Sequence, residues 1–216
     1  MDHDERAARA SAYESVRDEI VELVPAEVRR VLDLGCSTGW LAAALKARAE
    51  VEVVGIEREP AYAEEARAHC DRVVVADVEA VPDGLGRFDC LVAADVLEHL
   101  VDPWEALDAY AAMLEPGCRA VISLPNAAHW TTFAALARGT WPRRPEGIHD
   151  ATHLRWFTLR DAIELCEGAG LVVEHVERRP WLLWRGSPLD RHAGPLARLS
   201  PFTFQHVLAA RRMARP

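Results

Sequence analysis

The stretch Val31-Leu32-Asp33-Leu34-Gly35-Cys36-Ser37-Thr38-Gly39 decides the fold. An apolar strand ends near an acidic residue, turns through small residues and leads into an Ala- and Leu-rich segment that is typical of a helix. Glycine lets the backbone come close to a ligand, and parallel sheets bind ligands at the edge where their strands end. The stretch therefore predicts a ligand-binding turn between a first strand and a helix.

Strand-like and helix-like segments alternate on both sides of this turn, which indicates an α/β fold with a parallel sheet. No internal repeat or low-complexity linker divides the chain, so we expect one domain over residues 1–216. Helices are expected over residues 5–23, 38–49, 60–69, 103–115 and 159–167. Strands are expected over residues 30–34, 51–56, 72–76, 88–93, 119–124, 171–176 and 202–210.

Two of these helices carry recognisable start signals. Asp102, Pro103 and Glu105 have the pattern of an N-cap, a first-turn proline and the acid of a capping box. Thr158 and Asp161 have the same three-residue spacing. We therefore expect helices to begin at residues 103 and 159.

A segment of different composition, residues 125–157, separates the fifth and sixth expected strands. It contains three of the seven Trp residues and three His residues, and it is too long for a plain crossover. Insertions of this length are commonly lids or binding loops. Because loops that follow parallel strands emerge at one edge of the sheet, we expect this lid to meet Trp181 and Trp184, which follow the sixth strand.

Acidic residues end three successive strands. Asp33 closes the first strand, Glu57 follows the second, 22 residues after Gly35, and Asp77 follows the third. Each acid alone could be a solvated side chain, and the glycine turn alone could be a plain connection. Their common register predicts instead a site for a nucleotide, in which Glu57 accepts hydrogen bonds from a ribose and Asp77 meets adenine.

The spacing of the turn distinguishes between nucleotide ligands. The dinucleotide fingerprint is Gly-x-Gly-x-x-Gly, whereas this chain has Gly-x-x-x-Gly with Ser37 in the middle. An acidic lining suits a cation better than a pyrophosphate. S-adenosylmethionine carries a sulfonium charge and no phosphate, so it fits this pattern better than NAD.

Several stretches have the character of successive motifs of one family: residues 31–39, 55–57, 76–78, 88–100, 114–117, 124–126, 149–158 and 205–210. They resemble the motifs of class I S-adenosylmethionine-dependent methyltransferases, and in particular the small bacterial methyltransferase-23/methyltransferase-11 type. The resemblance covers about residues 12–212. Ser37 departs from it, because many members have Gly there, but Ser is small enough to keep the turn.

The resemblance implies a Rossmann-like three-layer sandwich, with a seven-stranded, mostly parallel sheet, an antiparallel last strand and a lid between strands five and six. The implied parts are a leading helix (5–23), a cofactor-binding part (28–124), a lid (125–157) and a C-terminal part (158–212). The implied cofactor is S-adenosyl-L-methionine, with S-adenosyl-L-homocysteine as product. Its implied contacts are Asp33, Gly35, Cys36, Ser37 and Gly39 for the methionine end, Glu57 for the ribose, Asp77 and Val78 for adenine, and Ala94 and Asp95 near the sulfonium.

Two residues of the leading helix extend this implied site. Tyr13 and Arg17 are placed to close over the amino-acid end of the cofactor. The alternative is that both lie on a solvated helix face, and the sequence does not separate these readings.

We expect methyl transfer to an oxygen of a small molecule, with a general base that removes the proton of the acceptor. Histidine suits this role near neutral pH, and the candidates are His129, His149 and His153, with Asp150 as an orienting acid. The alternative is catalysis by proximity alone. For His99 we expect a structural hydrogen bond, and we expect no metal site.

The aromatic and basic residues of the lid are candidates for acceptor binding. Clustered Trp side chains can stack on a planar or sugar acceptor, although they can equally close a small core of the lid. The candidates are Trp130, Trp141, Arg143, Arg144, Trp156, Trp181 and Trp184.

Charge is divided unevenly along the chain. The net charge is −9, with −14 over residues 1–120 and +5 over residues 121–216. The total disfavours a nucleic-acid partner, which usually requires a basic surface. The basic second part suggests an anionic acceptor drawn to arginines of the lid side, although these arginines can also be ordinary solvated residues. They are Arg143, Arg144, Arg155, Arg178, Arg179 and Arg185.

The expected location is the cytoplasm. No apolar run is long enough to span a bilayer, the charged N-terminus does not resemble a secretion signal, and five scattered cysteines indicate free thiols. No oligomeric state is predicted. Two alternative functions stay open: a binding module that keeps the cofactor fold without catalysis, and, less well supported, an NAD-dependent oxidoreductase.

Overall fold

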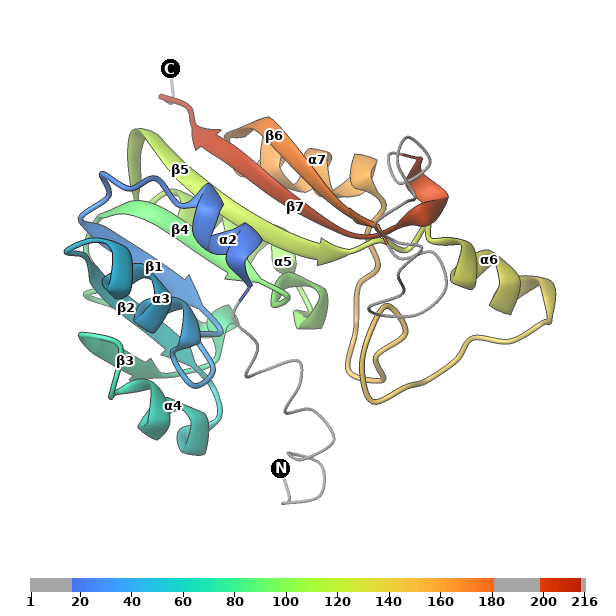
Figure 1. The fold of residues 1–216 in the computed structure, drawn as a ribbon, viewed down its shortest axis with the longest axis horizontal. Coiled ribbons are helices and arrows are strands. Elements are labelled where there is room, and N and C mark those ends of the chain that lie inside the picture. Colours follow the sequence, from blue (N-terminus) through green and yellow to red (C-terminus); the bar gives the residue numbers. More distant parts are fainter. Residues whose placement is uncertain (1–16, 181–198, 215–216) are drawn as a thin grey trace.

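One sheet organises the molecule. The computed structural model describes residues 17–180 and 199–214, and within them seven strands follow the order β3-β2-β1-β4-β5-β7-β6 (Figure 1). β7 pairs antiparallel with β5 and β6, and the other pairs are parallel, as predicted. The strands are β1 (Arg30–Leu34), β2 (Glu52–Glu57), β3 (Arg72–Val75), β4 (Phe88–Ala94), β5 (Leu114–Pro125), β6 (Leu171–Pro180) and β7 (Thr203–Arg212).

Helices cover both faces of the sheet, which makes three layers. Successive side chains of a strand point to opposite faces, so Val31 packs in one core and Leu32 in the other. The Val31 core includes residues of α2 (Asp18–Leu23), α3 (Trp40–Arg48) and α4 (Pro60–Ala66). The Leu32 core includes residues of α5 (Pro103–Ala111) and α7 (Leu159–Gly168).

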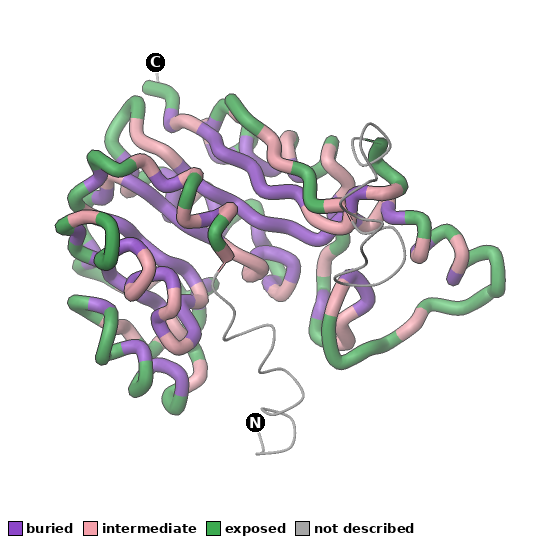
Figure 2. Tube along the Cα trace, viewed as in Figure 1, coloured by how far each residue is buried: buried purple, intermediate pink, exposed green. Residues whose placement is uncertain are grey.

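The central strands are buried on both faces, as the purple trace in Figure 2 shows. In β1, every residue from Val31 to Leu34 is buried. Strands of parallel sheets that are covered on both sides are expected to be continuous apolar runs. This explains why the central strands were recognisable as such runs and not by alternation.

The predicted helix starts are present with one difference. Thr158 and Asp161 form a complete capping box at α7. At α5, Asp102 accepts a hydrogen bond from the Glu105 amide at 3.0 Å, but the Asp102 amide donates to Glu79 at 2.8 Å. The reciprocal acid of the box therefore comes from a distant short 3-10 helix, η1 (Val78–Ala80).

The insertion contains a helix that the sequence did not predict, α6 (Trp130–Ala137). In Figure 1, α6 and the segment after it extend from the end of β5 away from the sheet. Main-chain contacts attach this lid: residue 126 forms a β-bridge with residue 157, and the Ala127 amide donates to the Phe157 carbonyl at 2.8 Å.

Strand ends also differ from the prediction. β5 begins at Leu114 instead of residue 119, because Leu114 pairs with Phe88 before a shift in register. β6 and β7 extend to Pro180 and Arg212 because they pair with each other along their whole length. Pairing partners distant in sequence set these ends, so local propensity could not place them.

Some predictions concern residues outside the described part of the chain. The leading helix predicted over residues 5–23 is described only from Arg17 onward, where α2 begins at Asp18. Tyr13, Trp181, Trp184 and Arg185 lie outside the described residues. Among residues 17–180 and 199–214, no helix combines the length and the apolar character needed to cross a membrane.

Candidate active site

The backbone of the turn after β1 adopts a conformation that favours glycine. Gly35, Ser37 and Gly39 have positive φ angles of 65°, 49° and 83°. A Cβ atom on Gly35 would lie 2.6 Å from a methyl carbon of Val96, and one on Gly39 would lie 3.1 Å from Cα of Ala66. The turn is therefore both left-handed and tightly packed, and the two glycines satisfy both conditions.

Glu57 lies against this turn, as the common register predicted. Its carboxylate accepts a hydrogen bond from the Ser37 amide at 3.0 Å and another from the Glu59 amide at 2.8 Å. A carboxylate has about four acceptor sites, so Glu57 keeps capacity for ligand hydroxyl groups. The structure thus places an ionisable acceptor at the rim of the glycine turn.

Asp33 is buried below the turn, with a relative exposure of 3%. Burial, followed by the nearby Cys70 and Glu57, raises the pKa of the Asp33 carboxyl well above its usual range. A cation held close to this carboxyl would favour its ionised form. The acidic end of β1 is therefore suited to a positively charged ligand.

Cys36 and Cys70 form a buried thiol pair behind the turn. A hydrogen bond between the two side chains raises the pKa of Cys36 and lowers that of Cys70. Both sulfur atoms lie above Gly55, where a Cβ atom would be only 3.4 Å from the Cys70 sulfur. All five cysteines of the chain are described and free, as predicted.

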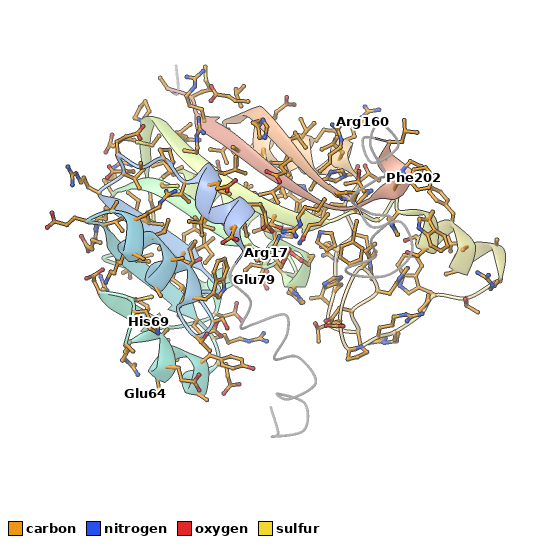
Figure 3. The ribbon with its side chains drawn as sticks, in the orientation of Figure 1. Arg17, Glu64, His69, Glu79, Arg160 and Phe202 are labelled. Carbon is orange, nitrogen blue, oxygen red and sulfur yellow. The ribbon has the colours of Figure 1, made fainter. Side chains whose placement is uncertain are left out.

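Asp77 and Val78 follow β3 at the same edge. Asp77 caps η1 by accepting a hydrogen bond from the Glu79 amide at 3.0 Å, and Glu79 is labelled in Figure 3. Val78 is buried, and its carbonyl accepts a hydrogen bond from the Tyr110 hydroxyl at 2.8 Å. A capping acid and a buried valine side by side are compatible with the predicted adenine contact.

Asp95 follows β4 with a positive φ of 56° and forms a network with Arg17. The Arg17 guanidinium, labelled in Figure 3, donates to Asp95, to the Ser123 hydroxyl at 3.0 Å and to the Gln205 side chain at 2.9 Å. Ser123 and Gln205 also donate to the Asp95 carboxylate. The structure therefore joins two predicted residues, Arg17 and Asp95, to two that the sequence did not indicate.

Two of the predicted lid histidines have local structural contacts. His129 is the N-cap of α6, with Nδ1 2.8 Å from the Thr131 hydroxyl and 3.4 Å from the Thr131 amide. His149 lies with Nε2 3.4 Å from the Thr132 hydroxyl. Burial, followed by the charge of Arg144, lowers the pKa of His149.

His153 is brought to a different place, beside the short helix η2 (Leu97–His99). Its Nε2 lies 3.9 Å from a carboxylate oxygen of Glu98, and its ring centroid lies 4.7 Å from that of His99. Burial, followed by His153, lowers the pKa of His99 to about 4. Burial, followed by Asp95, raises the pKa of Glu98 well above its usual range.

Asp150 orients this group through Thr152. The Asp150 carboxylate accepts hydrogen bonds from the Thr152 amide at 2.8 Å and the Thr152 hydroxyl at 2.6 Å. The Thr152 oxygen lies 3.0 Å from Nδ1 of His99. Asp150 of the lid is therefore linked to His99 of η2 through Thr152. From the sequence, only a structural hydrogen bond was expected for His99.

Among the described residues, the group of side chains that could hold a metal ion is Glu98, His99 and His153, whose ligand atoms all lie within 4.8 Å of one another. The sequence suggested no third ligand near His149 and His153, and predicted no metal. Glu98 is remote from them in sequence, and its backbone binds the two residues that follow His153. Its carbonyl accepts hydrogen bonds from the amides of Leu154 and Arg155 at 2.8 and 3.0 Å.

Part of the predicted aromatic cluster is present. Trp141 and Trp156 contact each other edge to face with ring centroids 5.2 Å apart, and both are more than 40% exposed. Trp130 packs separately, beside His129. Among the basic candidates, Arg143 donates to the Ala151 carbonyl at 3.0 Å, and the Arg144 amide donates to the His149 carbonyl at 2.9 Å.

The comparisons with known proteins agree with this geometry. Residues 5–176 match the model of the Methyltransferase domain family called Methyltransf_23. The chain belongs to this methyltransferase family. The predicted membership of the S-adenosylmethionine-dependent methyltransferase family and the predicted Rossmann-like sheet are thereby confirmed, and the NAD-dependent oxidoreductase alternative was wrong.

Individual relatives share only a minority of their residues with this methyltransferase chain. The ubiquinone biosynthesis O-methyltransferase of Cereibacter sphaeroides (strain KD131 / KCTC 12085) is 30% identical over 156 residues, which cover 68% of this chain and 62% of that protein. The chain thus spans less than two thirds of the length of that relative.

Solved structures show the same fold. A methyltransferase of Haloferax volcanii in complex with the Trm112 methyltransferase activator has a TM-score of 0.70 and 15% identity, over 99% of this chain and 95% of that one. Magnesium protoporphyrin IX methyltransferase of Synechocystis PCC 6803 with bound S-adenosylhomocysteine has a TM-score of 0.63 and 16% identity, over 97% and 85% of the two chains.

Proposed function

We propose that this chain transfers a methyl group from S-adenosylmethionine to an oxygen atom of a small molecule. The observation that carries the proposal is the row of carboxylates at the ends of β1, β2, β3 and β4, grouped around a left-handed glycine turn. Membership of the family supports S-adenosylmethionine as the cofactor, and similarity to the O-methyltransferase of Cereibacter sphaeroides supports an oxygen acceptor. We infer that residues 1–216 act as one domain with a lid over residues 125–157.

The site fits a cationic cofactor residue by residue. Asp33 and the Gly35–Gly39 backbone would hold its methionine end, and Glu57 would hold the ribose. Asp77 and Val78 would contact adenine. Ala94 and Asp95 would lie near the sulfonium, where Arg17 crosses from α2 toward the ends of β4 and β5. Burial of Asp33 supports this assignment, because a buried carboxyl gains most from a nearby positive charge.

The reaction is a displacement at carbon. The acceptor oxygen forms a bond to the methyl carbon, the carbon–sulfur bond breaks, and its electron pair stays on sulfur. The proton of the acceptor hydroxyl passes to a base or to water. The chain supports this step mainly by alignment and by exclusion of water. Among the lid candidates, His153 lies beside Glu98 and His99 near the end of β4, and it is the candidate base when no ion occupies that group.

The lid surface supports a planar or sugar acceptor that carries a negative charge. Trp141 and Trp156 are each more than 40% exposed, and such aromatic surface can stack on a planar or sugar acceptor. Arg143 and Arg155 donate to backbone carbonyls, which carry no full charge, so the lid surface stays positive. The free cysteines support a reducing location, for which we propose the cytoplasm.

Calorimetry with S-adenosylmethionine tests the cofactor site. Glu57→Ala removes the proposed ribose acceptor and should weaken binding about 10- to 100-fold, the effect of losing hydrogen bonds to a charged group. Gly35→Arg should abolish binding because its side chain would enter the turn. Glu64→Ala changes an exposed acid of α4 and is the matched control. Unchanged affinity in both site variants would refute the assignment.

A methyl-release screen with labelled cofactor against pools of small metabolites tests the reaction itself. Label found in an ether or ester product would identify an oxygen acceptor. Label found on nitrogen or carbon would overturn the oxygen assignment while keeping the enzyme. Cofactor binding without turnover on any pool would favour the alternative of a non-catalytic binding module.

A further inference from the structure

Glu98, in the short helix η2, is a buried acid. It is 1% exposed, and neither of its carboxylate oxygens has a hydrogen-bond partner. A buried carboxyl without hydrogen-bond partners costs free energy that a fold normally avoids. The backbone of Glu98 is held in place, because its carbonyl accepts hydrogen bonds from the amides of Leu154 and Arg155. A buried acid that lacks hydrogen-bond partners and is held in place by its backbone indicates a ligand-binding site.

Two imidazole rings face this carboxylate. Nε2 of His153 lies 3.9 Å from Oε1 of Glu98, and the rings of His99 and His153 approach edge to face at 4.7 Å. One atom from each of Glu98, His99 and His153 lies within 4.8 Å of the other two. A shift of about 1 Å would bring all three to the spacing of ligands around one metal ion, whose bonds to nitrogen and oxygen are about 2.0–2.2 Å.

The other ring nitrogens are held in the manner of metal-binding histidines. Nδ1 of His153 lies 3.1 Å from the Ile148 carbonyl, which can only accept, so this nitrogen carries the proton. The Thr152 hydroxyl donates to Asp150, so its oxygen accepts from Nδ1 of His99. Both rings therefore carry the lone pair on Nε2, and each has the second partner that usually orients a ligating histidine.

We propose that Glu98, His99 and His153 form a binding site for one divalent transition-metal ion. Two imidazoles and one carboxylate favour Zn²⁺, Mn²⁺ or Fe²⁺ over Mg²⁺ or Ca²⁺, which prefer sites built from oxygen. The site joins η2 to the lid, so an ion there fastens the lid to the sheet. Three protein ligands leave coordination positions for water or for an acceptor.

A second consequence rests on the proposed function. The site adjoins Asp95, whose charge acts on the Glu98 carboxyl, and Asp95 lies at the predicted methyl-transfer end of the cofactor. An ion at this place would lower the pKa of an acceptor hydroxyl that reaches it. The hydroxyl proton would leave to water, and the oxygen would attack the methyl carbon as described above.

Metal binding is measured on the full chain after chelation, by calorimetry with Zn²⁺ and Mn²⁺ and by the visible absorption of added Co²⁺. We expect one ion per chain, and Co²⁺ bands typical of nitrogen ligation. Glu98→Gln and His153→Gln keep side-chain volume and should each weaken binding at least tenfold. Thr152→Val removes the acceptor behind His99 and should weaken binding about 10- to 100-fold.

Exposed histidines provide the controls. His69 and His175 are exposed and lie outside the cluster, so His69→Ala and His175→Ala should bind the ion as the parent does. Loss of binding in these variants would show adventitious surface binding and overturn the site. Thermal unfolding of each variant without metal separates loss of a ligand from loss of the fold, and the Co²⁺ spectrum of the parent gives a reading that needs no variant.

The outcomes distinguish this proposal from the proposed function. No stoichiometric ion in the parent, or equal affinity in Glu98→Gln and His153→Gln, overturns the metal site, while S-adenosylmethionine binding can still be intact. One bound ion together with no methyl transfer keeps the site and overturns the function. Metal-stimulated release of label, lost in Glu98→Gln, supports both.

Discussion

At the scale of single residues, Gly35 combines two constraints that can be separated by experiment. Its φ is +65°, and a Cβ atom would lie 2.6 Å from Val96. Gly35→Ala should destabilise the chain by about 1–3 kcal/mol and should weaken binding of S-adenosylhomocysteine. Chemical denaturation gives the first quantity and calorimetry gives the second.

Gly84 is the matched control for this substitution. Its φ is +69°, but nothing lies within 4 Å of a Cβ atom placed there. Gly84→Ala should therefore show the cost of the left-handed backbone alone, about 1 kcal/mol, and should bind cofactor normally. Equal losses of stability and of binding in the two variants would show that close packing at Gly35 has no role.

His206 on β7 predicts a pH dependence of stability. Both ring nitrogens are buried without hydrogen-bond partners, and burial, followed by the charge of Arg178, lowers the pKa of His206 to about 4. The unfolded chain takes up a proton near pH 6.5, so the folded state is favoured less as pH falls from about 6.5 to 4. The full loss from this group is about 3 kcal/mol.

His206→Leu tests the assignment. Without the imidazole, the free energy of unfolding should fall less between pH 6.5 and pH 4 than it does for the parent, because one proton uptake by the unfolded state is gone. Urea denaturation at several pH values measures the difference between the two curves. Parallel curves for parent and variant would show that His206 does not contribute.

At the scale of elements, α7 depends on a capping box that the sequence already showed. Thr158 and Asp161 satisfy each other's amides, and α7 packs its buried face against the sheet. Thr158→Ala should cost about 1 kcal/mol of stability. Because both side chains serve one box, Thr158→Ala and Asp161→Ala combined should cost less than the sum of the single changes; additive losses would argue that the two caps are independent.

The elements also show where local patterns stop being informative. Capping signals, prolines and apolar runs placed the helix starts and the central strands, because these depend on neighbouring residues. The start of β5 and the ends of β6 and β7 depend on pairing with distant strands. The sequence did not predict α6, because its aromatic side chains also suit a binding loop and its residues were assigned to a lid.

At the scale of the whole molecule, the division of charge has a measurable consequence. The part before residue 121 carries −14, and the part after residue 120 carries +5. If the acceptor found by the methyl-release screen is an anion, its KM should rise with salt, because screening weakens attraction to an exposed basic surface. The affinity for S-adenosylmethionine should change less, since Asp33, one of the carboxylates proposed to bind it, is buried.

Charge reversal at one position localises this effect. Arg143→Glu places a negative charge on the lid and should raise the acceptor KM and flatten its salt dependence. Arg160→Glu makes the same change on the exposed surface of α7, beside Glu164, and should leave the acceptor KM close to that of the parent. A KM independent of salt would argue against steering by the lid.

The sequence by itself determined the alternation of strands and helices around the glycine turn and the acids at the strand ends, and its resemblance to known motifs indicated the family and the cofactor. The alternation follows from short-range patterns: a turn that needs glycine, apolar runs, caps, and acids in register with strand ends. The tertiary structure alone decided that Arg17 meets Asp95 with Ser123 and Gln205, and that Glu98 and His99 meet His153. Such groups join residues far apart in the chain, and only the packing of the sheet and the attachment of the lid bring them together.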